Sequence, residues 1–269
     1  MTERIMLMTD SWLDRRPDAP AKMSREEWKL RCQLADCFNL FYFMGWTEAI
    51  FNHITLRVAG PERHYLLNPF GLTYEEVTPD NLVKVDIDGN IVGYSAYPRN
   101  LAGYIIHGAI HAAREDAHCI MHVHTDAGMA VACKAAGLSH DNFYGAQLAG
   151  QIGYHDFEGV ASEVDERPRM VASLGDKPIL IMRNHGLLVV GPDVPQTFRL
   201  MWTLQRACEI QLAAASIAGP NIPLSDATLK HTAVTHAKFE ATGDIAALQF
   251  AAMVRRMRRE TAGRPYANR

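Results

Sequence analysis

The chain has 269 residues, of which 48% are apolar and 21% charged, and its formal net charge is −3. Such a composition supports a sizeable core in one large domain or two small ones, and it argues against a nucleic-acid-binding protein, where a basic face is expected. No apolar run approaches the roughly 20 residues of a membrane span, and the acidic N-terminus is unlike a secretory signal. The five cysteines form no CxxC pair, which favours reduced core residues in a cytoplasmic protein.

The first half of the chain is predicted to form an arm, a helix and a group of strands. Residues 1–22 contain prolines and charges and read as an N-terminal arm. Ser24 and Glu27 match a capping box, and apolar residues at helical spacing follow until Gly45 ends the helix. Strands are predicted at 53–58, 64–68 and 82–87, and the turn Asp88-Gly89 predicts a hairpin into a strand at 91–94.

The second half alternates helices and strands and ends in helices. Helices are predicted at 104–114, 126–136, 193–218 and 244–260, and strands at 118–124, 178–182 and 187–190. Neither an internal repeat nor a domain linker is evident. We therefore expect one layered domain over residues 23–269, with a mixed or antiparallel sheet covered by helices.

Two histidine motifs, about sixty residues apart, are the most informative feature. His122 and His124 lie two residues apart in an apolar strand, so their side chains share one face. His185 ends another apolar strand, and Gly186 after it permits a tight turn. Three imidazoles that leave coordination positions open are typical of a catalytic metal, which can polarise a carbonyl. From spacing alone, a metal site and ordinary hydrogen-bonded histidines are about equally favoured.

Several further motifs carry a resemblance to a known family. The chain resembles the class II aldolase and adducin family from about residue 26 to 218, and especially its adducin-like branch. The motifs are Gly45-Trp46, Asn52-His53-Ile54-Thr55, Asn68-Pro69-Phe70-Gly71, Val83-Lys84-Val85-Asp86, Ala113-Arg114-Glu115-Asp116, His122-Val123-His124 and Arg183-Asn184-His185-Gly186.

The resemblance implies an α/β fold: a single three-layer α/β/α domain with a central, mostly antiparallel sheet, often assembled as a homotetramer. It also implies that His122, His124 and His185 bind a divalent metal. Zinc is the usual metal of the sugar-phosphate members, whose reaction passes through an enediolate, and iron(II) and manganese are the alternatives here. The expected partner is a small-molecule substrate, without nucleic acid or membrane.

The chain departs from the aldolase pattern at two places. The acid/base glutamate of the aldolases aligns with Gly103, which can neither move a proton nor bind a metal. Their phosphate-binding residues align with Asn52-His53-Ile54-Thr55 and with Leu101-Ala102. A non-phosphorylated substrate is therefore expected.

Other polar residues are candidates for the chemistry. His107, Tyr154 and His155 are candidates for moving a proton, and Asn52, His53 and Arg99 for binding the substrate, with an arginine suited to a carboxylate. The competing interpretations are a buried structural histidine for His107, strand-edge hydrogen bonds at 154–156 and an exposed loop arginine for Arg99. Tyr266, in a C-terminal tail, is a candidate for reaching a neighbouring subunit.

Three functions stay open. The first is a metal-dependent lyase that acts on a small keto or hydroxy acid by retro-aldol cleavage or decarboxylation through an enolate. The second is a non-haem Fe(II) oxygenase that uses the same three histidines. The third is a non-catalytic, adducin-like interaction module.

Overall fold

The computed structural model describes residues 23–159, 164–241 and 244–262. The predicted arm at 1–22 and the tail with Tyr266 lie outside these residues. The described residues contain one seven-stranded sheet in the order β3-β2-β1-β4-β7-β6-β5. Its strands are β1 (His53–Arg57), β2 (Tyr65–Leu67), β3 (Val83–Val85), β4 (Cys119–Val123), β5 (Ile152–His155), β6 (Ile179–Met182) and β7 (Gly186–Gly191). Every pairing is antiparallel except that of β5 with β6.

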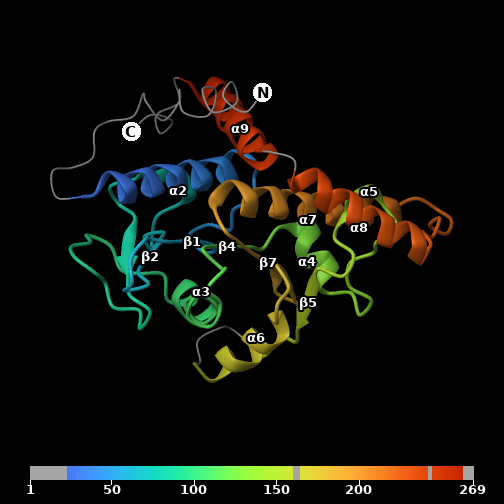
Figure 1. Ribbon diagram of the computed structural model, residues 1–269, viewed down its shortest axis with the longest axis horizontal. Coiled ribbons are helices and arrows are strands. Elements are labelled where there is room, and N and C mark those ends of the chain that lie inside the picture. The colour runs from blue at the N-terminus through green and yellow to red at the C-terminus, as the bar shows by residue number, and fades with distance from the viewer. Residues whose placement is uncertain (1–22, 160–163, 242–243, 263–269) are drawn as a thin grey trace.

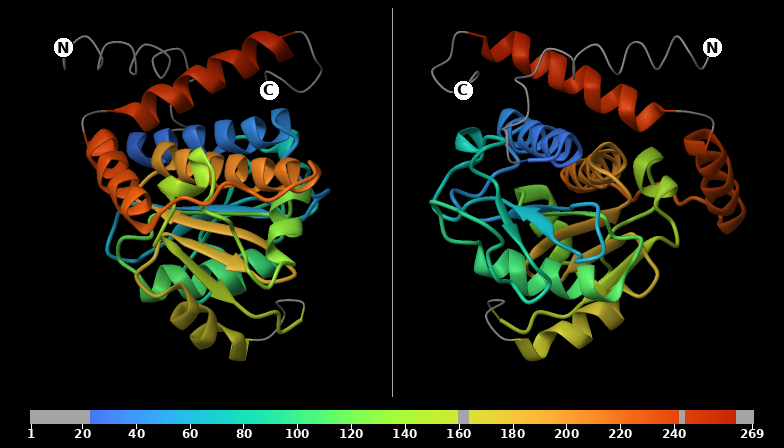
Figure 2. Two further views of the ribbon diagram at one scale, coloured as in Figure 1. Left: turned by 90° about the vertical axis from the view of Figure 1, so that its right-hand side faces the viewer. Right: turned by 60° about the vertical axis from the view of Figure 1, so that its left-hand side comes forward.

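Helices cover both faces of this sheet (Figures 1 and 2). One face packs against α2 (Arg25–Phe43), α4 (Asp126–Ala132) and α7 (Val194–Ala215), and α9 (Ile245–Thr261) lies over α2 and α7. The other face packs against α3 (Leu101–Ala113) and α6 (Arg167–Leu174). The short elements are η1 (Tyr74–Glu76), α5 (Phe143–Gln147) and η2 (Val164–Glu166), and α8 (Asp226–Ala241) lies beside α5. The three-layer α/β/α prediction is confirmed.

The first helix shows how the local sequence produces its element. The Ser24 hydroxyl accepts a hydrogen bond from the Glu27 N–H at 3.1 Å, which satisfies one of the free amides of the first turn. The Glu27 carboxylate pairs with Arg31 and Lys84, which joins α2 to β3. Gly45, with φ +73°, follows the helix end. The predicted start and stop are therefore confirmed.

Some predicted and observed elements differ. The hairpin expected after Asp88-Gly89 is reduced to a single bridge between Val85 and Ile91. The Asp86 carboxylate holds the turn by accepting from the N–H groups of Asp88 and Asn90. Strand β5 and helices α5, α6 and α8 were not predicted. Helix α8 buries no residue, so it lacks the apolar period from which helices are recognised.

Strand alternation separates two environments on β1. Ile54 and Leu56 enter the larger core beneath α2 and α7. His53 and Thr55 point to the opposite face, where α3 lies. His53 pairs in register with His122 of β4, so a polar row on β1 runs beside the predicted metal ligands. None of the described helices has the length and apolar character needed to cross a bilayer.

Candidate metal centre

The three predicted ligands come together in the structure. His122 lies on β4, His124 follows the end of that strand, and His185 lies directly before β7. One ring nitrogen from each can be chosen so that all three lie within 4.8 Å of one another. The ring centroids are 4.7 to 4.9 Å apart. The cluster is half-buried, because His122 is enclosed and the other two are partly exposed.

The turn before β7 brings His185 to the cluster. Asn184 has φ +55°, a left-handed conformation that asparagine tolerates better than most residues. Gly186 follows, and a Cβ atom there would lie 2.5 Å from the carbonyl oxygen of Val123 and 3.0 Å from the His124 ring. Only glycine allows β7 to approach β4 this closely, which explains the Asn184-His185-Gly186 motif.

A backbone carbonyl fixes the tautomer of His122. Its Nδ1 donates to the Leu187 carbonyl at 3.0 Å, which leaves Nε2 as an unprotonated nitrogen 2.8 Å from Nε2 of His124. A carbonyl that orients a ligand histidine in this way is typical of metal sites.

Burial keeps the cluster neutral. It lowers the pKa of His122 well below its usual value, and the neighbouring His185 lowers it further. Burial, with help from His124, lowers the pKa of His185 to about 4. Burial also lowers the pKa of His124. The three rings are thus uncharged near neutral pH, which is the form that binds metal.

The donor set fits a divalent metal. Tetrahedral zinc at its normal bond length separates ligand nitrogens by roughly 3.4 Å, a value that lies between the 2.8 Å and 4.8 Å seen in the cluster. Three imidazoles leave a position open for substrate, as in catalytic sites. The same three imidazole donors suit iron(II) equally well, so the donor set does not distinguish zinc from iron(II).

His53 occupies the space beside Gly103. A Cβ atom on Gly103 would lie 3.2 Å from Cβ and Cγ of His53 and 2.9 Å from Leu67. The His53 ring stacks on His122 with centroids 4.9 Å apart. An imidazole from β1 therefore fills the place next to the cluster that a side chain from α3 would need.

His107 does not reach the cluster directly. Its Nε2 lies 3.0 Å from Nδ1 of His53, and its Nδ1 lies 2.9 Å from the Thr55 hydroxyl. The same hydroxyl lies 2.8 Å from Nε2 of His111. Sequence reasoning missed Thr55 and His111. The signal was present in the spacing, since His107 and His111 are four residues apart on one helix face.

Unpartnered polar atoms gather near the start of β1. Asn52 and Asn68 are 2% and 0% exposed, and within the described residues neither amide has any hydrogen-bond partner. Nε of Arg99 is also buried without a partner. Asn100 contacts the Asn52 carbonyl, and Arg99 pairs with Pro69, so these residues are neighbours. Buried polar groups normally have partners, so this group is a candidate substrate-binding surface; Asn68 was not predicted.

Arg99 and two of the proton-transfer candidates have protein partners. The Arg99 guanidinium lies over the Tyr104 ring at 5.2 Å. The Tyr154 hydroxyl accepts from the Leu138 N–H at 3.1 Å. His155 contacts the Ser173 hydroxyl at 3.0 Å and the Glu166 carboxylate at 3.1 Å, so both of its nitrogens are engaged.

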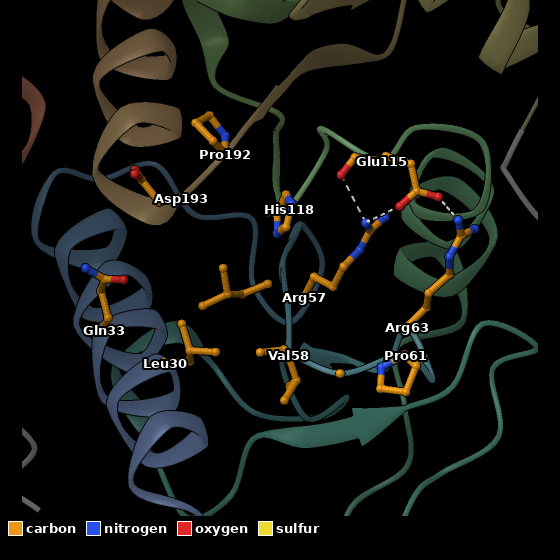
Figure 3. Close-up of a pocket in the computed structure, with 13 residues that line it drawn as sticks. Leu30, Gln33, Arg57, Val58, Pro61, Arg63, Glu115, His118, Pro192 and Asp193 are labelled. Atoms are coloured by element: carbon orange, nitrogen blue, oxygen red, sulfur yellow. Dashed lines mark hydrogen bonds and ion pairs between the residues drawn. The ribbon is translucent and has the colours of Figure 1, made fainter.

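A pocket of about 410 Å³ lies elsewhere, at the opposite end of β1 and β4 (Figure 3). None of the predicted site residues lines it. Arg57 and Arg63 both pair with Glu115 at its rim. Arg57 also donates to the carbonyls that end α3, those of His111, Arg114 and Glu115. These ion pairs and hydrogen bonds therefore stabilise the fold at the end of α3.

Comparison with known proteins identifies the family. Residues 32–212 match the model of the class II aldolase and adducin N-terminal domain. A Caulobacter vibrioides protein described as a "putative aldolase class 2 protein" is 44% identical over 76% of this chain and 79% of its own length. Rat alpha-adducin is also 44% identical, over 73% of this chain, but the match spans only 27% of that protein.

Solved structures agree with the sequence comparisons. An aldolase II superfamily protein from Pseudomonas syringae superposes with a TM-score of 0.80 and 39% identity, covering 89% of this chain and 96% of its own. L-fuculose 1-phosphate aldolase from Glaciozyma antarctica superposes with a TM-score of 0.76 and 25% identity, over 96% and 97% of the two chains. The chain belongs to the class II aldolase and adducin family.

Proposed function

We propose that this protein is a divalent-metal-dependent lyase of the class II aldolase type that cleaves or decarboxylates a small, non-phosphorylated keto or hydroxy acid. The observation that carries the proposal is the convergence of three neutral imidazoles at the end of a buried strand, beside buried polar atoms that have no partner among the described residues. Zinc is the metal we favour. When bound by His122, His124 and His185 it would supply Lewis-acid stabilisation of negative charge on a substrate oxygen.

The substrate-binding residues support an acid rather than a sugar phosphate. Asn52, His53 and Asn68 surround the start of β1, where the phosphate-binding loop of the aldolases would lie. Each amide offers two donors and an acceptor, which suits the oxygens of a small polar acid. Arg99 supplies a cation nearby for a carboxylate.

The three candidates for proton transfer differ in how they connect to the cluster. His107 is linked to it through His53. Tyr154 accepts a hydrogen bond and keeps its own hydroxyl proton available. His155 is held at both nitrogens. We therefore favour a route through His107 and His53, with Tyr154 and His155 as the alternatives.

We also propose that the protein is a cytoplasmic homotetramer, as the family resemblance implies. The described cysteines are all free, which agrees with a reducing compartment.

A non-catalytic interaction module is the second candidate, and the 44% identity with alpha-adducin favours it. An Fe(II) oxygenase is the third, because the same donors suit that metal. The first test is metal analysis of protein purified without added metal, with His122→Ala and His185→Ala as variants and the exposed His118→Ala as the matched control.

For a lyase, the wild-type protein and the control hold about one zinc per chain, and both cluster variants hold none. The zinc protein then releases carbon dioxide or an aldehyde from members of a panel of keto and hydroxy acids. Bound iron with substrate-dependent oxygen uptake would instead establish the oxygenase. A protein that retains its cellular phenotype without metal would establish the module.

A further inference from the structure

A chain of hydrogen bonds runs from the histidine cluster into the protein interior. It joins His53 Nδ1 to His107 Nε2 at 3.0 Å, His107 Nδ1 to the Thr55 hydroxyl at 2.9 Å, and that hydroxyl to His111 Nε2 at 2.8 Å. It ends where His111 Nδ1 meets the Ala117 carbonyl at 2.9 Å. Strand β1 contributes its members at alternate positions, and α3 contributes two that are one helical turn apart.

The inner end of the chain fixes the position of every proton along it. A carbonyl oxygen only accepts, so the Ala117 carbonyl requires the proton of His111 on Nδ1. Nε2 of His111 then accepts, and the Thr55 hydroxyl must donate its single proton to it. The hydroxyl oxygen can now only accept from His107 Nδ1, which leaves His107 Nε2 as an acceptor.

The outer end of the chain follows by the same rule. His107 Nε2 must receive the proton carried by Nδ1 of His53, and so Nε2 of His53 is left without a proton. This order requires the rings to be uncharged. Burial lowers the pKa of His107 well below its usual value and that of His111 to about 3, so both rings are neutral.

The unprotonated nitrogen lies on the one ring of the chain that borders the cluster. His53 stacks on His122, whereas His107 and His111 are 0% exposed and His53 keeps 3%. Among the described residues, Nε2 of His53 has no hydrogen-bond partner. This nitrogen can therefore accept a hydrogen bond from a ligand bound at the cluster.

We infer that Thr55, His107 and His111 are positioning residues that hold His53 in a single tautomer, so that its Nε2 accepts a hydrogen bond from a hydroxyl group of the substrate. The substrate half of this inference rests on the proposed function and narrows it to hydroxy acids. A keto oxygen and a carboxylate both lack a proton to donate, and either would face the lone pair of Nε2 unfavourably.

A purely structural network of these four residues would order the same protons, so the tautomer tests the order of the hydrogen bonds and the binding comparison below tests the positioning role. The first test therefore reads the tautomer directly, by nitrogen-15 NMR of protein as purified with labelled histidine, and the His53→Gln spectrum assigns the resonances. The expected wild-type result is a proton on Nδ1 and none on Nε2. In Thr55→Val the order is broken and a mixture of tautomers is expected, whereas Thr55→Ser keeps the wild-type spectrum.

A proton on Nε2 of His53 in the wild-type protein overturns the inference, and this measurement needs no variant to fold. An unchanged His53 spectrum in a folded Thr55→Val protein overturns it as well, because Thr55 would then have no part in selecting the tautomer.

The second test compares lactate and pyruvate binding to the zinc-loaded protein by calorimetry. One hydrogen bond to the hydroxyl predicts that lactate binds about tenfold more tightly, and that this ratio falls toward one in Thr55→Val but not in Thr55→Ser. A preference for pyruvate overturns the hydroxyl assignment. If neither acid binds, the proposed acid substrate is wrong, and the NMR result alone decides the tautomer.

Discussion

Both ends of the β1–β4 strand pair hold polar groups, but these groups differ in their hydrogen-bond partners. At the pocket end, Arg57 donates to three backbone carbonyls and, with Arg63, pairs with Glu115. At the cluster end, three histidines converge, no described carboxylate pairs with them, and the amides of Asn52 and Asn68 bond to no described residue. Polar groups that the protein satisfies hold the fold, whereas groups left unsatisfied are available to a ligand. Substitutions at the pocket end should therefore change the stability of the fold, whereas substitutions at the cluster end should change binding.

The largest effect is expected for Gly186→Ala, because the new methyl group would press on the Val123 carbonyl and on the ligand rings. Displacing ligands in this way should weaken zinc binding about 10- to 100-fold, measured by competition with a chromogenic chelator. Gly191→Ala is the matched control: it lies on the same strand, and its methyl group would clash with Thr197 at the pocket end. Equal losses of zinc affinity in both variants would contradict the division between the two ends.

Arg57→Met tests the pocket end. It removes several hydrogen bonds to the end of α3 while keeping the length of the side chain, and it should cost about 2–3 kcal/mol of stability, measured by urea unfolding. Zinc affinity should not change. A loss of zinc affinity in the folded variant would show that the two ends are coupled.

The buried histidine chain predicts a pH dependence of stability. The pKa of His111 is about 3 in the folded protein, below the value of about 6.5 expected in the unfolded chain. The unfolded state therefore binds the proton first, so the contribution of His111 to stability is complete above pH 6.5 and is lost as the pH falls toward 3. His111→Phe, which cannot titrate, should flatten the dependence of the unfolding free energy on pH over this range. If the unfolding free energy of His111→Phe depends on pH as steeply as that of the wild-type protein, groups other than His111 cause the dependence.

The smallest effect is expected for Asn68→Leu, and its sign is informative. Replacing a buried amide that has no hydrogen-bond partner in the described part of the chain removes a desolvation cost, so stability should rise by about 1 kcal/mol. Binding of the acid substrate should weaken in the same variant. A decrease in thermal stability would mean that the amide has a structural partner, such as an ordered water.

The sequence was sufficient to predict the convergence of three histidines and most of the sheet. His122, His124 and His185 carried a local signal, because strand alternation and the Asn184-His185-Gly186 turn are readable from neighbouring residues. The hydrogen bond between His53 and His107 could not be predicted from neighbouring residues. It depends on α3 packing across β1, and no local pattern reports which helix covers which strand.

Other omissions have different physical reasons. Strand β5 is only four residues long and contains Gly153, so it lacks the continuous buried run of β4. Helix α8 has no buried face. The strand at 91–94 was predicted from the Asp88-Gly89 turn, but Ile91 and Tyr94 are exposed and only Ile91 forms a bridge to β3.

The contact between His53 and Gly103 has a consequence for how this site can change. A carboxylate restored at position 103 meets the imidazole at position 53, so Gly103→Glu alone should disturb the cluster. We therefore expect the two positions to vary together, because a smaller residue on β1 would make room for a larger residue on α3. A site with an acid on α3 would therefore arise from this one through a paired substitution. A variant that carries only one of the two changes would have unfavourable steric contacts.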